Sequence, residues 1–269
     1  MNIQKTLRIY IPFAKSQIQR IMAYRFRLVL QILSGYITII ASYFLWRAIF
    51  NSSGSGLMNG FTFSEMSAYI LLIFAVSEMT DSPVCWFIGE EVRDGSIAMN
   101  LIKPINYSTR LFFCAMGGNL FNTFAIAGPL FLIVGIFFHG VTSVPQVIFF
   151  IISVFLSFCI NYFFDMCFSM ISFYTTYVWG LQMLKYSLLR FLSGAIIPFA
   201  FFPANLSRTF ELLPFAGLGY TPVMIYLGKY QGNELALFLG LQMFWVLFFL
   251  GISMLLWRWA IKRLTILGG

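Results

Sequence analysis

The chain alternates between long apolar stretches and shorter segments that carry most of its charge. A membrane-spanning helix needs ~20 predominantly apolar residues. Six stretches approach or exceed this length: Leu28–Phe50, Phe63–Ile88, Leu111–Phe138, Gln146–Phe173, Tyr186–Phe202 and Glu234–Trp257. The pattern therefore predicts an all-α membrane protein with six transmembrane helices that form a single transmembrane domain over residues 1–269.

The segment before the first stretch has a different pattern. Its apolar residues recur at helical spacing with basic residues between them: Ile3, Leu7, Ile11, Ala14, Ile18, Ile21 and Met22. This spacing is typical of a basic amphipathic helix in the membrane interface. Pro12 has no amide hydrogen, so we expect the helix to start near it or to kink there. Residues 1–27 are thus predicted to form an interfacial helix, and a simple N-terminal anchor is the alternative.

The segment from 203 to 233 also departs from the spanning pattern. Pro203, Pro214 and Pro222 interrupt its apolar patches, and no piece is long enough to cross. Irregular backbone at membrane depth is tolerated only where protein covers it. We therefore expect an extracytoplasmic re-entrant hairpin between the fifth and sixth spans.

Composition supports the membrane class, because 60% of the residues are hydrophobic and only 10% are charged. Soluble domains carry roughly 25% charged residues. Most of the 17 lysines and arginines lie in segments that the six-span topology places on one side, whereas Arg47, Arg208 and Lys229 lie on the other. Basic residues mark the cytoplasmic side, so both termini are predicted to be cytoplasmic. The net charge of +8 is then a topology signal, and no nucleic-acid partner is expected.

Motifs for covalent chemistry are not found in the sequence. The four cysteines form no C-x-x-C pair, and the single histidine, His139, adjoins an expected outer turn, so we expect no metal site. There is no G-x-x-x-x-G-K-[ST] phosphate loop and no H-E-x-x-H. We therefore expect no catalytic residues and no cofactor bound by this chain.

Polar residues inside the apolar stretches are a first set of candidate functional groups, because burying them in a membrane is costly. Glu78 lies near the middle of the second stretch. A stripe recurs every four residues in the fourth: Ser153, Ser157, Asn161, Asp165 and Ser169. A substrate pathway or dimer seam formed by Glu78, Ser157, Asn161 and Asp165 is one interpretation. Interhelical hydrogen bonds that serve packing are the other.

The second candidate is the cytoplasmic loop at 89–110, GEEVRDGSIAMNLIKPINYSTR. Ser82-Pro83 before it indicates a kink or a fresh helix start, and Gly95 indicates a turn. Ile97, Leu101 and Ile102 follow at helical spacing, and Lys103-Pro104 ends the run. The loop could dock to a cytosolic partner or could be an ordinary solvated connection.

The run RDGSIA at 93–98, followed by LIKPINY at 101–107, resembles the corresponding loop of ABC-2 type permeases, the membrane subunits of ATP-binding-cassette exporters. The match is nearest to the subgroup often paired with drug- and antibiotic-export ATPases, and the overall topology is similar too. The resemblance implies that the loop is a coupling helix in a groove of the ATPase. The contact residues would be Glu90, Glu91, Arg93, Asp94, Gly95, Ile97 and Leu101.

The resemblance further implies an exporter for an amphipathic or hydrophobic compound, such as a drug, antibiotic, peptide or lipid-like molecule. ATP and Mg would bind a separate cytosolic ATPase dimer. The chain would pair with a second copy or a related permease in the bacterial cytoplasmic membrane. The rival class is an ion-gradient-driven carrier or channel that uses Asp165 and Glu78.

Overall fold

The computed structural model describes residues 3–54, 56–138, 143–175 and 178–262. Within them lie five helical stretches that are long and apolar enough to cross a membrane: Arg25–Ser53, Phe63–Arg93, Tyr107–Phe137, Val144–Phe173 and Gly232–Ile261. The expected all-α membrane architecture is therefore confirmed. His139 and Arg263 lie outside the described residues.

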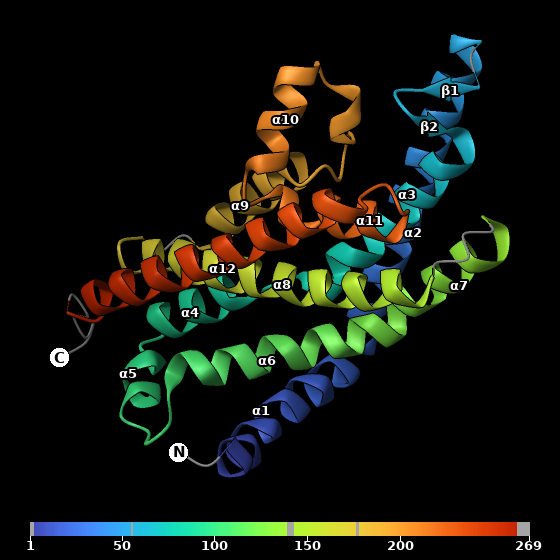
Figure 1. Ribbon diagram of the computed structural model, residues 1–269. Helices are drawn as coiled ribbons and strands as arrows, with labels where there is room; N and C mark the ends of the chain where they lie inside the picture. The colour runs from blue at the N-terminus through green and yellow to red at the C-terminus, as the bar shows by residue number, and fades with distance from the viewer. Residues whose placement is uncertain (1–2, 55, 139–142, 176–177, 263–269) are drawn as a thin grey trace.

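Helix α1 (Ile3–Ala23) lies along α6 (Tyr107–Asn122), as Figure 1 shows. The two backbones approach closely at Gly117, which has no Cβ; a Cβ there would collide with the backbone of Ala14. The Tyr10 hydroxyl also accepts a hydrogen bond from the Asn106 amide at 2.8 Å. The helix begins at Ile3 and runs through Pro12, so a start near Pro12 was a wrong expectation. A proline costs one backbone hydrogen bond, and packing against α6 compensates for it.

Helix α2 (Arg25–Ser53) ends at Gly54, whose φ of 64° is the left-handed conformation that suits a helix C-terminus. A short hairpin follows, with β1 (Leu57–Met58) paired to β2 (Phe61–Thr62). Asn59 and Gly60 both have positive φ, as a two-residue hairpin turn requires. Thr62 and Glu65 then form a capping box that starts α3 (Phe63–Thr80).

The second spanning stretch is broken at Asp81-Ser82-Pro83, between α3 and α4 (Val84–Arg93). Pro83 supplies no amide hydrogen, which agrees with the break expected from the sequence. Gly95, at φ 76°, turns the chain into the short helix α5 (Ser96–Leu101), after which α6 begins. The loop at 89–110 therefore contains a short helix held between α4 and α6.

The third spanning stretch combines α6, a π-helical turn at Thr123–Ala127, and α7 (Gly128–Phe137). Pro129 cannot donate the backbone hydrogen bond that an α-helix needs there, and a widened turn accommodates that loss. The fourth consists of α8 (Val144–Ser169) and a 3₁₀ turn at Met170–Phe173.

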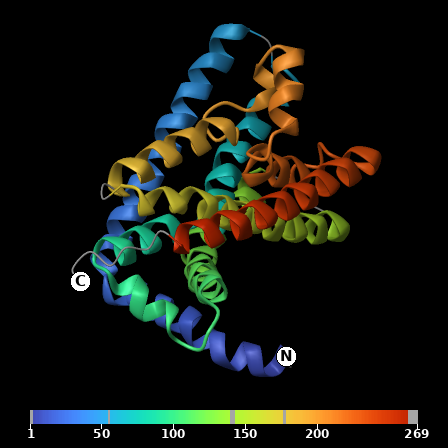
Figure 2. The same ribbon diagram turned by 90° about the vertical axis from the view of Figure 1, so that its left-hand side faces the viewer.

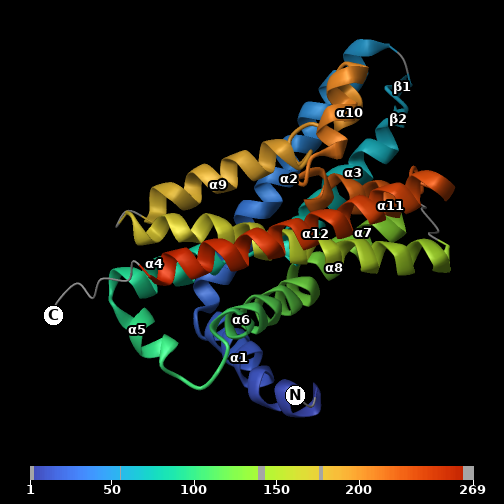
Figure 3. The ribbon, with the colours of Figure 1, turned by 60° about the vertical axis from the view of Figure 1, so that its left-hand side comes forward.

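The segment expected to form the fifth span differs from the prediction. Its helix α9 covers Val178–Leu192, not Tyr186–Phe202, and Gly194 then turns the chain at φ 76°. A 3₁₀ turn at Phe199–Phe201 leads to α10 (Ala204–Leu212). Figure 3 shows α9 and α10 in succession. The apolar run therefore contains a short helix and a turn instead of one long helix.

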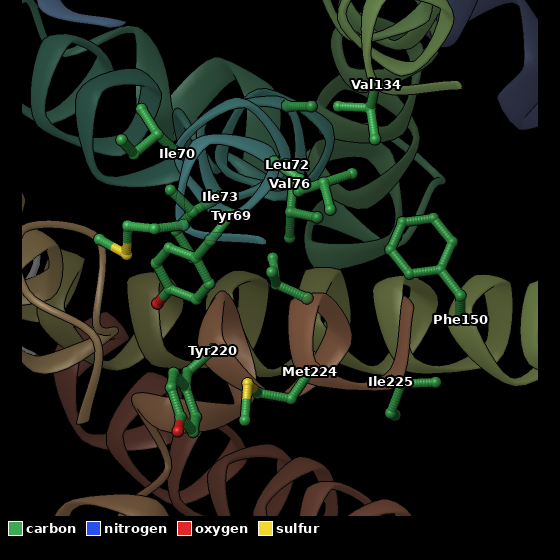
Figure 4. Packing of buried hydrophobic residues seen from close by; sticks show 14 of the residues in the cluster. Tyr69, Ile70, Leu72, Ile73, Val76, Val134, Phe150, Tyr220, Met224 and Ile225 are labelled. Carbon is green, nitrogen blue, oxygen red and sulfur yellow. The ribbon is translucent and has the colours of Figure 1, made fainter. Parts of the chain in front are cut away.

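After α10 the chain returns through a 3₁₀ turn at Ala216–Leu218 and α11 (Tyr220–Tyr226) to α12 (Gly232–Ile261). Helix α11 is buried against α8 and α3. In Figure 4, Tyr220, Met224 and Ile225 of α11 face the α3 side chains that include Tyr69 and Ile73. Protein thus covers this irregular region, as backbone at membrane depth requires.

The molecule has two distinct ends. Helix α5 and the end of α12 lie at one end, whereas the β-hairpin and the end of α7 lie at the other (Figures 1 and 2). One buried apolar cluster lies around α3, α7, α8 and α11. A second lies around α4, α6, α8 and α12, on the side of α5.

Candidate functional site: a polar cavity beside a broken helix

A cavity of about 470 Å³ lies between α2, α3 and α9. Its size is within the ~300–1,000 Å³ of typical ligand sites. Helix α2 contributes a polar face with Gln31, Ser34, Thr38 and Ser42, which recur at helical spacing. Polar groups converging on a hollow within an apolar bundle make this cavity the leading candidate for a functional site.

Glu78 of α3 lies in the wall of this cavity. Its Oε2 atom accepts hydrogen bonds from Gln31 Nε2 at 3.0 Å and from Asn122 Nδ2 at 3.3 Å. These donors come from α2 and α6, so three helices fix the carboxyl group in place. The sequence identified Glu78 correctly as a polar group inside the bundle but gave no sign of its two partners.

The break after α3 leaves backbone carbonyls without helical partners, and side chains from three helices supply the missing donors. Asn161 Nδ2 donates to Thr80 O at 2.7 Å, and Asn119 Nδ2 donates to Asp81 O at 2.9 Å. Lys185 Nζ lies 3.3 Å from Ser82 O. Each carbonyl of the break is thus satisfied from a different neighbour: α8, α6 or α9.

Asp165 of α8 is fully buried and organises the same break from its other side. Its Oδ2 atom accepts hydrogen bonds from the Ser82 hydroxyl at 2.9 Å and from the Cys85 amide at 3.0 Å. Its Oδ1 atom pairs with Lys185 Nζ at 2.7 Å. A carboxylate at the first amides of a helix stabilises them, so Asp165 caps α4 while it neutralises Lys185.

The other members of the α8 stripe take part in packing. Gln242 of α12 receives a hydrogen bond from the Ser153 hydroxyl at 2.9 Å and lies 3.1 Å from the Ser157 oxygen. Its amide nitrogen also donates to Gly217 O at 2.8 Å. Ser169 bonds locally to Met166 O. Of the stripe, Asn161 alone lines the cavity, and this geometry favours the packing interpretation for Ser157 and Asp165.

The loop around α5 divides into buried and exposed residues. Ile97 is 2% exposed, and Leu101 packs against the same apolar cluster. Glu91 pairs with Arg110 Nη2 at 2.7 Å and accepts the Tyr107 hydroxyl at 2.7 Å. Glu90 is half-buried. These residues attach the segment to α4 and α6.

Arg93, Asp94 and Gly95 are exposed, and so are Met99 and Ile102, at 64% and 75%. The Ser96 hydroxyl and amide donate to Asp94 Oδ1 at 2.6 and 3.0 Å, and they hold the pKa of this carboxyl below its usual range. Met99 was not noticed in the sequence and Ile102 was named only for its helical spacing, although their apolar character in a charged loop is a signal that could have been used.

Lys185 was also missed as a functional residue, because the topology count includes it only among the basic residues of the cytoplasmic side. Lys185 is 6% exposed. The available signal was the Ser82-Pro83 break, because a broken helix in an apolar bundle needs donors and acceptors from its neighbours.

A family model described as "ABC-2 family transporter protein" matches residues 36–268 of the chain. The match includes the broken helix, the loop around α5 and most of the cavity lining, but Gln31, Ser34 and Gly35 of that lining precede it. No curated protein matches the chain.

Proposed function

The chain belongs to the ABC-2 family transporter proteins, as a multi-pass membrane permease of an ABC transporter, and on this premise we propose that it is the exporting subunit of an ATP-driven pump. Its partner would be a cytosolic ABC ATPase dimer that binds ATP and Mg. Two permease copies, or this chain and a related one, would face each other above it. The compound exported would be amphipathic or hydrophobic and would pass through the cavity between α2, α3 and α9.

The observation that carries this proposal is the construction of the loop around α5. Glu91 attaches the loop to α6 through its ion pair with Arg110, and Ile97 packs in the buried apolar cluster around α4, α6, α8 and α12. Arg93, Met99 and Ile102 remain exposed at the end of the molecule where α12 ends. An exposed apolar pair on a rigid support, beside charges, fits the composition of a protein interface.

A path from this loop to the cavity follows from the contacts of the broken helix. A push on α5 would move α4, whose first turn is held by Asp165. Asp165 pairs with Lys185 of α9, and α9 lines the cavity through Tyr186 and Arg190. ATPase closure would thereby change the shape of the cavity. This is the two-state mechanical coupling that the proposed pump needs.

The test is capture of the ATPase by the purified chain. The double variant Met99→Ser/Ile102→Ser should lower ATPase co-purification at least tenfold, because it removes apolar contact area without disturbing the buried Ile97. The matched control is Leu206→Ser/Leu212→Ser in α10, which removes two exposed leucines at a different surface. ATP turnover and substrate efflux in reconstituted vesicles complete the measurement.

Equal capture of the ATPase by wild type and by Met99→Ser/Ile102→Ser would refute this docking surface. Transport that persists without any ATPase, and that depends on an ion gradient, would instead support the rival carrier.

A further inference from the structure

One end of the cavity is acidic. Glu78 and Asp81 both line it, and Asp81 is exposed toward it although the residue lies within the bundle. Neither carboxylate takes part in any ion pair of the described residues, in contrast to the neighbouring Asp165. Arg190 is the described arginine that lines the cavity, and its guanidinium lies over the Tyr186 ring, 5.6 Å from the centroid. The cavity therefore offers two carboxylates outside any ion pair, and the buried Lys185 that lies near Asp81 is already paired with Asp165.

Asn161 provides an independent observation at the same place. Its side chain is 7% exposed and lines the cavity, and its Nδ2 atom is used by Thr80 O. Its Oδ1 atom has no hydrogen-bond partner among the described residues. Buried amide oxygens are nearly always paired, so an unpaired one indicates a missing donor or cation. The negative end of this carbonyl dipole adds to the charge of Glu78 and Asp81.

Much of the remaining wall is aromatic and aliphatic, although the polar face of α2 and Arg190 of α9 also line it. Trp46, Tyr69, Phe74 and Tyr186 line it, together with Ile39, Ile70 and Ile73. Aromatic faces attract organic cations, and aliphatic side chains accept an apolar body. The cavity thus combines an acidic end with a long apolar wall.

From this juxtaposition we propose that the cavity selects amphipathic organic cations. The positive group lies among Glu78, Asp81 and Asn161, and the apolar body lies against the aromatic and aliphatic side chains that α2, α3 and α9 contribute. The inference rests on the proposed function, because it names the class of compound that the pump would carry. It goes beyond that function because it assigns the sign of the substrate charge and the residues that bind the charged group.

A pair of ions with the same shape and opposite charge tests this directly. Binding of tetraphenylphosphonium and of tetraphenylborate is measured on the chain in lipid nanodiscs, together with any ATPase that co-purifies. Wild type should bind the cation more tightly than the anion. Glu78→Gln/Asp81→Asn should weaken cation binding at least tenfold and leave anion binding equal or stronger.

The control, Glu211→Gln/Glu234→Gln, removes the same charge outside the cavity and should leave cation binding unchanged. If the double cavity variant does not fold, Gln31→Lys places a cation beside Glu78 and should weaken cation binding in the same way. The proposal would be overturned if the cavity variant lost affinity for both ions to the same extent. It would also be overturned if the cavity variant bound the cation as tightly as the control variant does.

ATPase capture is scored separately on the same wild-type sample. Charge-selective binding without an ATPase would leave the cation site standing and remove the pump. Capture of an ATPase without charge-selective binding would support the pump and refute the cation site. The two failures are therefore distinguishable.

Discussion

Asp165 and Lys185 illustrate how a buried ion pair constrains a membrane protein at the level of single residues. Desolvating two charges is costly, and the pair repays this cost only with good geometry and further hydrogen bonds. Asp165 has both, since Ser82 and Cys85 bind its second oxygen. Removing one partner should therefore destabilise the folded protein far more than removing both.

We predict that Asp165→Asn or Lys185→Met alone destabilises the protein by about 3–5 kcal/mol, because each leaves an unpaired buried charge or a broken helix cap. The double variant Asp165→Asn/Lys185→Met should recover much of this loss. Thermal unfolding of the purified chain and its variants measures the effect as a double-mutant cycle.

Additive losses in that cycle would contradict the assignment of the pair. A stable Asp165→Asn protein that has lost an ATP-independent, proton-coupled transport would revive the ion-driven carrier, with Asp165 as its proton site.

The sequence showed each of these residues but not their association. Asp165 was identified because it is the single acidic residue in the fourth apolar stretch, and Ser82-Pro83 predicted the helix break. Lys185 was counted as a cytoplasmic flanking charge, because the rule for basic residues treats every lysine as solvated. Helix packing decides which polar side chains meet at the broken helix, and a local sequence pattern does not contain this information.

At the scale of elements, α1 and α6 show how a single small residue sets an interhelical contact. A Cβ on Gly117 would meet the Ala14 backbone, whereas one on Gly118 would make ordinary contacts at 3.8 Å with Ile21 and 3.9 Å with Gln17. Two adjacent glycines on the same helix thus differ sharply in what they tolerate.

Gly117→Ala should push α1 away from α6 and lower stability by about 1–3 kcal/mol, the usual cost of overpacking. Gly118→Ala should be close to neutral or stabilising, since alanine favours the helix. Tryptic cleavage at Lys15 and Arg20 reports detachment of α1, and thermal unfolding reports the energy. Equal cleavage of the two variants would show that the close contact does not hold α1 in place.

The elements were predicted best where apolar runs are long and uninterrupted, as in α2, α8 and α12. The predicted bounds were wrong for α9, because hydropathy alone cannot distinguish a spanning helix from a short helix followed by a turn. Residues 186–202 are apolar enough for either. Gly194 at positive φ and Pro198 before the 3₁₀ turn decide for the turn, and they act through backbone geometry instead of hydropathy.

At the scale of the whole molecule, the number of crossings must be consistent with the directions of the long helices. Helices α8 and α12 run in the same direction, because Ser153 bonds to Gln242 and, further along both helices, Cys167 bonds to Phe249 O. The chain must therefore return from the end of α8 to the start of α12, and none of the five long helices lies between them. Helix α9 is about 22 Å long at 1.5 Å per residue. With residues 193–201 it is the remaining candidate for a sixth passage through the ~30 Å hydrocarbon core.

Single cysteines test this in a variant that lacks Cys85, Cys114, Cys159 and Cys167. We predict that cysteines at Leu57 and Arg208 react with an impermeant thiol reagent added outside the cell. Cysteines at Lys103 and Lys262 should react only after the membrane is opened, because basic loops stay cytoplasmic. All four replaced side chains are exposed, so a failure to react reports the side of the membrane and not burial.

The pairs also locate the source of any error. Leu57 follows α2, whereas Arg208 follows α9, so these two cysteines agree only if α9 completes a crossing. Lys103 and Lys262 likewise lie on the same side only if the passages between them are even in number. If Leu57 labels from outside while Arg208 does not, α9 enters and leaves by the cytoplasmic face. The cavity would then open beside a re-entrant helix, and the route for a cation past Glu78 would need a second copy of the chain to complete its outer half.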